Sequence, residues 1–315
     1  MFQKYKHEKL LAVIIILSTL AFFVLSSWRH AIFYSTAYDL AFFDQAIYLI
    51  SQGKIPIVSL VGFHILADHG AWLFYPLALL YKIYPDVHWL FALQAIALSM
   101  GAYPVWLLAR QAQIRESQAF ALAIAYLLYP TIFYVNLFDF HLDTIAVPFL
   151  LFAVYAARAK KVSFFIFSII IILACKAVLS LTVIAVGFWL FFFEKKRFYG
   201  VFALSAGILW FIIATQFIIP LFGNEAASVS RHVHRFSYLG DSISEISQNI
   251  IFKPWLVLGE IASLESLNYL IMLTLPLAWG LSPQHLIPLI GALPQLGINL
   301  LSESKTFKMI SFQYP

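Results

Sequence analysis

Long apolar runs separated by short polar segments make up most of the chain. Several approach the roughly 20 residues that a helix needs to cross a bilayer, and none alternates apolar and polar positions as a half-buried strand does. The pattern predicts an all-α, polytopic transmembrane helical bundle of about 7–9 spans, which forms a single integral membrane domain over residues 1–315. The expected spans are Leu10–Ser27, His88–Ala109, Ser117–Val135, Thr144–Ala157, Val162–Cys175, Ala177–Phe193 and Phe198–Phe222, with looser segments at Asn268–Leu281 and Gln284–Leu301.

Composition and charge agree with a membrane protein. The chain is 62% hydrophobic and only 11% charged, whereas soluble domains carry about 25% charged residues. The net charge of +5 would suit a nucleic-acid partner, but the basic residues lie in short clusters between apolar runs, as topology signals do. We therefore expect a lipid bilayer and no nucleic acid as partner. The only cysteine, Cys175, excludes an internal disulfide and a cysteine-based metal cluster.

The basic clusters predict the topology. Lys and Arg near the ends of spans favour the cytoplasmic side, so Lys4, Lys6 and Lys9 place the N-terminus inside. The first apolar run is longer than a signal-peptide core and no small-residue cleavage site follows it, so it is expected to be retained. The chain is then a multi-pass protein of the plasma membrane. The later inner clusters are Arg110 with Arg115, Arg158 with Lys160 and Lys161, and Lys195–Arg197.

This topology decides two ambiguous stretches. Ala71–Tyr84 would be only about 21 Å long as a helix, and as a span it would move every later basic cluster outside. It is expected to dip into the outer interface. Val162–Phe193 would run about 48 Å as one helix, through a bilayer core of about 30 Å. A hairpin that turns near Lys176 satisfies both length and charge.

The same topology sorts the acidic residues. Of 15 acidic residues, only Glu8, Glu116 and Glu194 fall inside. Acidic side chains contribute little to orientation. Their concentration on the outer face therefore indicates a catalytic or ligand site there.

The first outer loop, residues 28–70, contains the stretch YDLAFFDQAIYLISQGKIP, which predicts a short helix. Asp39 stands at the expected N-cap, and Gly53 and Pro56 mark the end. Asp39 would then be a cap and Asp44 a solvated side chain. Alternatively, one of them is a catalytic carboxylate at the membrane surface.

Three further polar residues follow in the same loop, at His64, Asp68 and His69. Mixed His and Asp side chains can bind a divalent ion or relay a proton. Interfacial histidines also occur because their ring tolerates both solvents. Their spacing matches no zinc signature.

The second outer loop, NLFDFHLDT, is shorter and carries Asp139, His141 and Asp143. In an extended loop the three would point to one side. On a helix, the two carboxylates would be like-charged neighbours that a divalent cation could relieve. The alternative is an ordinary helix start, where Asp143 faces the positive end of the helix dipole.

Basic side chains could bind an anionic group. Lys176 between two apolar helices suits a phosphate, or it extends to the interface as an ordinary anchor. The late outer loop, residues 223–267, carries RHVHR from Arg231 to Arg235. It suits a lipid phosphate, or general attraction to anionic headgroups. Ser242 and Glu245 form a capping box that predicts a short helix after it.

Four stretches together resemble the bacterial membrane proteins of domain-of-unknown-function family 2079. They are YDLAFFDQAIYLISQGKIP, FDFHLDTIAVPFLLFAVYAA, YLGDSISEI and LSPQHLIPLIGALPQLGINLLS, between about Tyr38 and Ser302. That family is remotely similar to C-type glycosyltransferases, which use polyprenyl-phosphate sugars. The likeness implies a catalytic Asp39 or Asp44, a second acidic motif at Asp139 and Asp143, and a divalent cation, Mg²⁺ or Mn²⁺. Lys176 matches a lysine between two short helices.

Two departures from the family pattern bear on activity. Acidic residues commonly follow that lysine, whereas this chain reads CKAVLS, and relatives usually continue where this chain ends at SFQYP. The resemblance thus implies a glycosyltransferase-like enzyme or a truncated, non-catalytic relative. A transporter or flippase of a lipid-linked or anionic substrate is the competing hypothesis.

Overall fold

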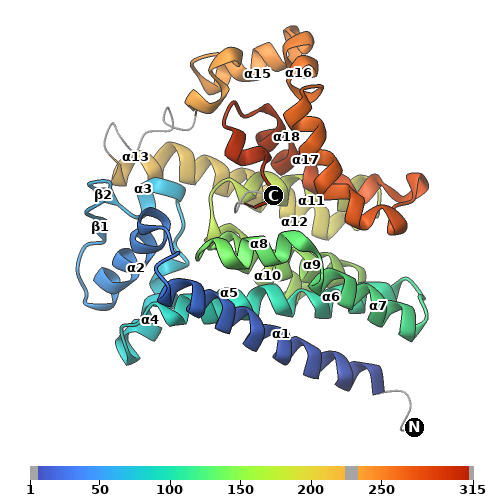
Figure 1. Ribbon diagram of the computed structural model, residues 1–315. Helices are drawn as coiled ribbons and strands as arrows, with labels where there is room; N and C mark the ends of the chain where they lie inside the picture. The colour runs from blue at the N-terminus through green and yellow to red at the C-terminus, as the bar shows by residue number, and fades with distance from the viewer. Residues whose placement is uncertain (1–5, 224–232, 312–315) are drawn as a thin grey trace. The chain divides into compact units, whose positions relative to one another are not determined.

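The computed structural model describes residues 6–223 and 233–311, and helices make up most of them (Figure 1). Contacts between elements divide the chain into two compact units. The first comprises residues 1–62 and 71–179, and the second comprises residues 63–70 and 180–315. The single-domain organisation of the sequence analysis stays a prediction, and each unit is described by itself.

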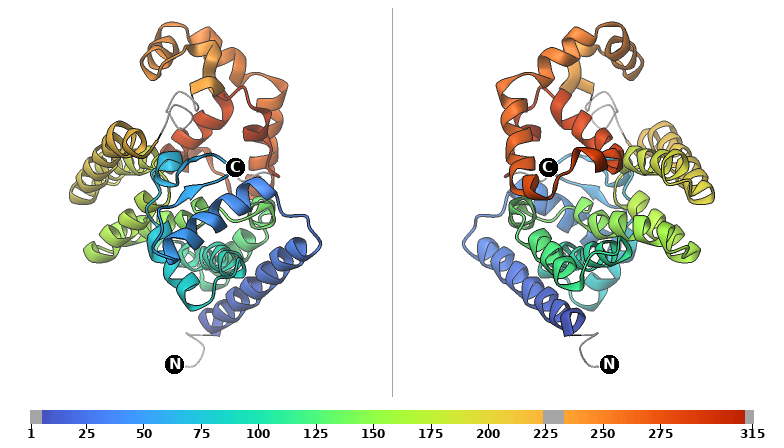
Figure 2. Two further views of the ribbon diagram at one scale, coloured as in Figure 1. Left: turned by 90° about the vertical axis from the view of Figure 1, so that its left-hand side faces the viewer. Right: turned by 90° about the vertical axis from the view of Figure 1, so that its right-hand side faces the viewer.

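The first unit is built from packed pairs of helices. α1 lies along α5, α6 packs on α7, and α10 packs on α9. One side of α1 is open, as both views in Figure 2 show, and apolar side chains such as Leu17 and Leu20 are more than half exposed there. The elements are α1 (Lys6–Ala31), α2 (Ala37–Ser51), β1 (Ile57–Val58), α4 (Phe74–Ile83), α5 (His88–Met100), α6 (Ala102–Gln111), α7 (Glu116–Leu127), α8 (Pro130–Phe138), α9 (Asp143–Arg158) and α10 (Val162–Cys175).

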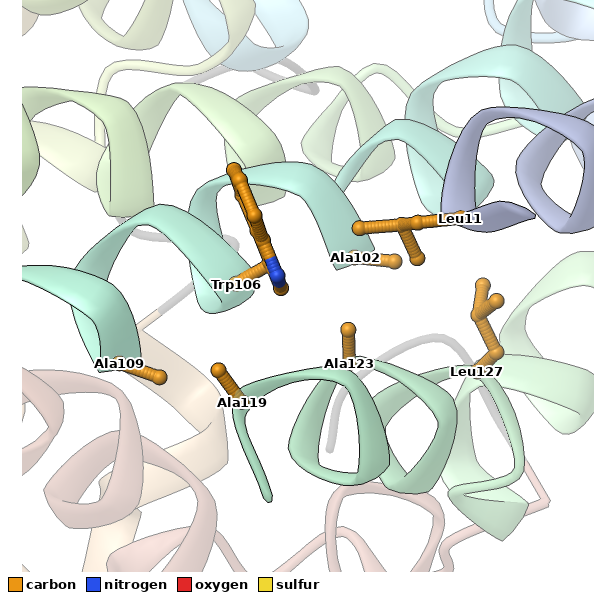
Figure 3. Close-up of a cluster of buried hydrophobic side chains, with 7 residues drawn as sticks. All are labelled: Leu11, Ala102, Trp106, Ala109, Ala119, Ala123 and Leu127. Carbon is orange, nitrogen blue, oxygen red and sulfur yellow. The ribbon is translucent and has the colours of Figure 1, made fainter. Parts of the chain in front are cut away.

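Small residues let α1, α6 and α7 approach closely. Figure 3 shows the alanines of α6 and α7 facing one another, with Trp106, Leu11 and Leu127 filling the space around them. Gly101 extends this contact, because a Cβ there would overlap the ring of Tyr126. The Tyr126 hydroxyl donates a hydrogen bond of 2.9 Å to the carbonyl of Leu98. The ring is therefore fixed against the α5–α6 junction.

The second unit contains a tight helix pair and a C-terminal segment. Gly187 and Gly207 lie where α11 and α12 meet, and a Cβ at Gly187 would come within 2.7 Å of the backbone nitrogen of Leu204. The helices and strand are β2 (Phe63–His64), α3 (Leu66–His69), α11 (Leu179–Phe192), α12 (Arg197–Ile213), the π-helical turn η2 (Ala214–Ile218), α13 (Ile219–Phe222), α15 (Ile243–Phe252), α16 (Pro254–Ile261), α17 (Leu264–Thr274) and α18 (Leu293–Leu301). Short 3₁₀ turns are η4 (His234–Leu239), η5 (Leu275–Gly280), η6 (Pro283–His285), η7 (Ile287–Ala292) and η8 (Lys305–Lys308).

The helices follow the predicted spans, but helix length alone supports fewer crossings. Four helices in the described residues are long and apolar enough to cross a membrane, at His7–Ala31, His88–Gln111, Glu116–Phe138 and Arg197–Phe222. A fifth is possible if the bent pair Pro254–Ile261 and Leu264–Gly280 forms one span. α10 and α11 have 14 residues each, or about 21 Å, which is short of a bilayer core. The figure of 7–9 spans therefore stays a prediction.

Some of the helix ends predicted from the sequence are confirmed, and one is wrong. The break near Lys176 is confirmed, since α10 ends at Cys175 and α11 begins at Leu179. Ser242 is confirmed as an N-cap, because its Oγ accepts a 3.1 Å hydrogen bond from the backbone of Glu245, while the Glu245 side chain accepts from the backbone of Asp241 rather than of Ser242. Asp39 was predicted as the N-cap of α2, but Thr36 is the N-cap and Asp39 lies in the first turn. α16 was not predicted from the sequence, and it has only eight residues.

Candidate functional site

Three segments of the first unit bring polar side chains together at helix ends. They are the junction between α1 and α2, the connection from α8 to α9, and the end of α10. The contacts of Asp139 with Arg29 and Thr36 join residues more than 100 positions apart in the sequence. The α1–α2 junction and the α8–α9 connection, which carry two of the predicted acidic motifs, therefore meet in this unit.

Asp139 is an enclosed carboxylate. Its side chain has no exposed area, and Arg29 Nη1 donates to its Oδ1 over 2.6 Å. Its Oδ2 accepts from the backbone nitrogen of Thr36 over 2.7 Å and from the Thr36 hydroxyl over 2.6 Å. The backbone of Asp139 has φ 154° and ψ 179°, a region that is occupied almost only by glycine. The surrounding bonds must hold this conformation.

Two buried amides fix the connection between α8 and α9. Gln94 is fully buried, and its Nε2 donates to the carbonyls of Asn136 and Asp139 over 3.0 Å each. Its Oε1 accepts from the backbone nitrogen of His141 over 3.0 Å. Asn136 in turn donates to the carbonyl of Phe22 and to Ser26 Oγ. Both ends of the connection are thereby tied to α1 and α5.

Asp39 and His141 form the accessible part of the site. His141 Nε2 lies 3.8 Å from Asp39 Oδ1, and the two side chains are 5% and 27% exposed. The imidazole packs edge-on to Phe43, at 5.4 Å between ring centroids. Asp39 also benefits from the positive end of the α2 dipole. A carboxylate beside an imidazole can accept or relay a proton.

Lys176 and Asp143 form an ion pair next to this group. Lys176 caps the C-terminus of α10, and its Nζ lies 2.8 Å from Asp143 Oδ2 in the first turn of α9. Their side chains are 11% and 31% exposed. Asp143 is two residues from His141, so the pair and the imidazole share one short connection. Asp139 and Asp143, which would repel each other as neighbours on a helix, thus each have a basic partner of their own.

Asp44 occupies a different position on α2. It accepts a 2.6 Å hydrogen bond from the Tyr81 hydroxyl of α4. The backbone nitrogen of Leu73 donates to the carbonyl of Ala174 over 3.1 Å. Asp44 therefore helps to link α2 to α4, which is itself linked to α10.

The remaining predicted residues belong to the second unit. His64 stacks on Phe222 at 4.5 Å between ring centroids, and burial lowers the pKa of His64. His69 Nε2 lies 2.9 Å from Asp68 Oδ2. Arg235 lies over the ring of Phe307 at 4.7 Å. Arg231 lies outside the described residues.

The side chains that could bind a metal ion do not converge on one point. Within residues 6–223 and 233–311, no group of three or more His, Cys, Asp and Glu side chains could hold a metal ion. In the first unit the reason is visible, since Asp139 faces Arg29 and Asp143 faces Lys176. The residues present therefore do not fit a divalent cation in this arrangement.

Sequence reasoning missed Arg29, Gln94 and Asn136. A signal existed for Gln94, which stands in the middle of the apolar run HWLFALQAIALSM, because a polar amide in such a run needs buried partners. Asn136 directly precedes the second acidic motif. Arg29 resembles an ordinary basic residue at a helix end, and its partner is 110 positions away.

Comparison with known proteins gives a family and no closer relative. No curated protein and no solved structure matches the chain. The family described as "Predicted membrane protein (DUF2079)" matches residues 29–315. This match includes α2, the α8–α9 connection and the end of α10. The chain therefore belongs to this family of membrane proteins.

Proposed function

We propose that the protein is a glycosyltransferase-like membrane enzyme that moves a sugar from a lipid-phosphate donor at the outer face of the plasma membrane. The observation that carries this proposal is the difference in surroundings between two neighbouring carboxylates. Asp139 is enclosed by Arg29 and Thr36, whereas Asp39 is partly exposed beside His141. One polar cluster thus contains an enclosed acid and an accessible one, and the accessible carboxylate can take a proton.

The chemistry is a displacement at the anomeric carbon. The acceptor oxygen bonds to that carbon, and the bond from the carbon to the phosphate oxygen breaks with its electron pair on the phosphate. Asp39 takes the acceptor proton, and His141 orients its carboxylate. Lys176 offers positive charge to the departing phosphate, and stabilisation of developing charge is commonly the largest catalytic term.

This assignment uses only residues of the first unit. Asp44 supports α2 through Tyr81, and Asp143 holds Lys176. His64, Asp68, His69, Arg231 and Arg235 have no role in the steps above. No step passes through Mg²⁺ or Mn²⁺, because Asp139 and Asp143 are already paired with Arg29 and Lys176.

The test is sugar transfer by the full chain in vesicles, with polyprenyl-phosphate hexoses as donors. Asp39→Asn keeps the shape of the side chain and removes the base, so transfer should fall by about 10²-fold or more. Asp86→Asn is the matched control, because Asp86 is an acid of the same unit outside the cluster. Undiminished transfer by Asp39→Asn would remove Asp39 from the mechanism.

A transporter of a lipid-linked or anionic substrate is the second candidate, and one feature of the second unit favours it. α16 and α17 bend by 59° at a break, and Lys308 pairs with Glu260 beside it. Broken helices with polar groups at the break form the substrate sites of many transporters. Accumulation of a lipid-linked sugar in sealed vesicles, abolished by Lys176→Ala or Glu260→Gln, would favour transport over transfer.

A further inference from the structure

Arg29 and Thr36 have no place in the proposed chemistry, yet they surround Asp139, the enclosed acid of the same polar cluster. We propose that Arg29, Thr36 and Asp139 form a clasp that positions Asp39, and that Asp139 is a positioning residue. This inference rests on the proposed function for its catalytic meaning. Its structural content stands on the contacts of these three residues alone.

The clasp fixes the start of α2 from outside that helix. Thr36 is the N-cap of α2, but its own side chain caps no backbone group of the helix. Instead its N–H and its hydroxyl both donate to Asp139 Oδ2. Asp39 follows three residues later, within the same first turn. The carboxylate from the α8–α9 connection therefore sets the position from which Asp39 projects.

Thr36 also controls which acid receives its proton. Its Oγ1 lies 2.6 Å from Asp139 Oδ2 and 3.4 Å from Asp39 Oδ2. A hydroxyl has one proton to donate, and the shorter contact takes it. The carboxylate of Asp39 can therefore still accept a hydrogen bond from a substrate hydroxyl. Loss of the Asp139 carboxylate would free this proton for Asp39.

Arg29 makes the burial of Asp139 tolerable. A buried carboxylate without a counter-charge is strongly unfavourable, and Arg29 supplies that charge at 2.6 Å. Its Nη1 also donates to the carbonyl of Phe138 over 3.0 Å. Arg29 thus holds both the side chain and the preceding backbone of Asp139 in the glycine-like conformation.

A thiol at position 39 can report on the clasp without any activity. The chain has one cysteine, Cys175, and it is buried. Asp39→Cys therefore adds one accessible thiol, and Cys175→Ser removes the background. We would measure the labelling rate by a membrane-impermeant maleimide when Thr36 is native, Thr36→Ser or Thr36→Val. Valine keeps the shape of threonine but lacks the hydroxyl, whereas serine retains it.

If the clasp holds the turn, Thr36→Val should speed labelling by about tenfold, because a hydrogen bond to a charged group is lost. Thr36→Ser should leave the rate near that of the native residue. Asp139→Gly relieves the backbone but removes the carboxylate, so it should label as fast as Thr36→Val or faster. Equal rates in all backgrounds would overturn the clasp.

Transfer by the chain with native Asp39 separates this inference from the proposed function. Thr36→Val should lower kcat and leave KM for the lipid donor unchanged, and Thr36→Ser should restore kcat. A purely structural role would lower the amount of folded protein and leave kcat unchanged. If labelling responds but the native chain transfers no sugar, the clasp stands and the proposed function fails.

Discussion

Asp139 of the first unit and the ion pairs of the C-terminal segment (residues 233–311) lie in different surroundings. In the first unit, Asp139 is enclosed between helix ends and its partner Arg29 is only 21% exposed. In the C-terminal segment, Lys308 is buried, but its partner Glu260 is 30% exposed, and the pair of Lys305 and Glu265 lies in the open.

Apolar side chains are exposed in both regions. Leu17 and Leu20 of the first unit are 59% and 54% exposed, and Trp255 and Leu264 of the C-terminal segment are 62% and 82% exposed. In a membrane protein, lipid rather than protein can cover such side chains. The difference between the regions therefore lies in particular charges. Asp139 is fully enclosed and needs its counter-charge, whereas Glu260 is partly exposed and can better tolerate the loss of Lys308.

The largest expected effect tests this difference directly. Arg29→Met removes the counter-charge of a side chain with no exposed area, so we expect a loss of about 3–5 kcal/mol in the free energy of unfolding. The double variant Arg29→Met/Asp139→Asn should recover at least half of the loss. Unfolding in detergent can be followed by the reaction of buried Cys175 with a fluorogenic maleimide.

Lys308→Met is the matched change in the C-terminal segment. The remaining Glu260 is partly exposed, so the loss should stay below about 1 kcal/mol. Circular dichroism would follow it, since Cys175 belongs to the first unit. Equal losses for Arg29→Met and Lys308→Met would remove the contrast between the two regions.

Packing at glycines gives an effect of intermediate size. A Cβ at Gly101 would overlap Tyr126, which is held by its hydrogen bond to Leu98. Gly101→Ala should therefore cost about 1–3 kcal/mol of unfolding free energy. Gly259 of α16 has no atom within 4 Å of such a Cβ, so Gly259→Ala should instead stabilise its helix by up to about 1 kcal/mol.

Thermal unfolding in one detergent compares these two variants. A cost at Gly259 as large as at Gly101 would mean that the C-terminal segment is packed as closely as the first unit.

The sequence predicted helix positions better than side-chain partners. Apolar runs gave Val162–Cys175 correctly because burial of such a run depends on its own composition. The pairing of Arg29 with Asp139 depends on how α1, α2 and α8 pack, and no periodicity within one segment records that packing. Asp39 was misplaced as the N-cap for the same reason, since the side chain that fixes the start of α2 comes from another element.

The sorting of charges in the sequence predicted part of the polar cluster. It directed attention to Asp39, Asp139, His141 and Asp143, and the structure brings Asp39 within 3.8 Å of His141. The sequence pattern could not distinguish an enclosed acid from an accessible one, because each is an aspartate near an apolar run. The difference lies in Thr36, whose N–H donates to Asp139 and whose hydroxyl lies closer to Asp139 than to Asp39.

The smallest expected effect concerns an exposed carboxylate of the first unit. Hydrogen bonds from the backbone and side chain of His88 lower the pKa of Asp86. A carboxyl group whose pKa is lowered in the folded state stabilises the fold at pH values above its ordinary pKa of 3.8. This contribution is lost as the pH falls through the lowered pKa. Because the side chain is one-third exposed, the contribution should be under about 1 kcal/mol.

Asp86→Asn should therefore lower stability slightly at pH 7 and flatten its decline below pH 4, as measured by Cys175 reactivity over a pH series. Arg29→Met should lower stability by the larger amount given above at pH 7. An Asp86 variant with an effect as large as Arg29→Met would show that exposure does not separate these carboxylates. The distinction between enclosed and accessible acids, on which the role of Asp39 depends, would then have to rest on the thiol-labelling rates alone.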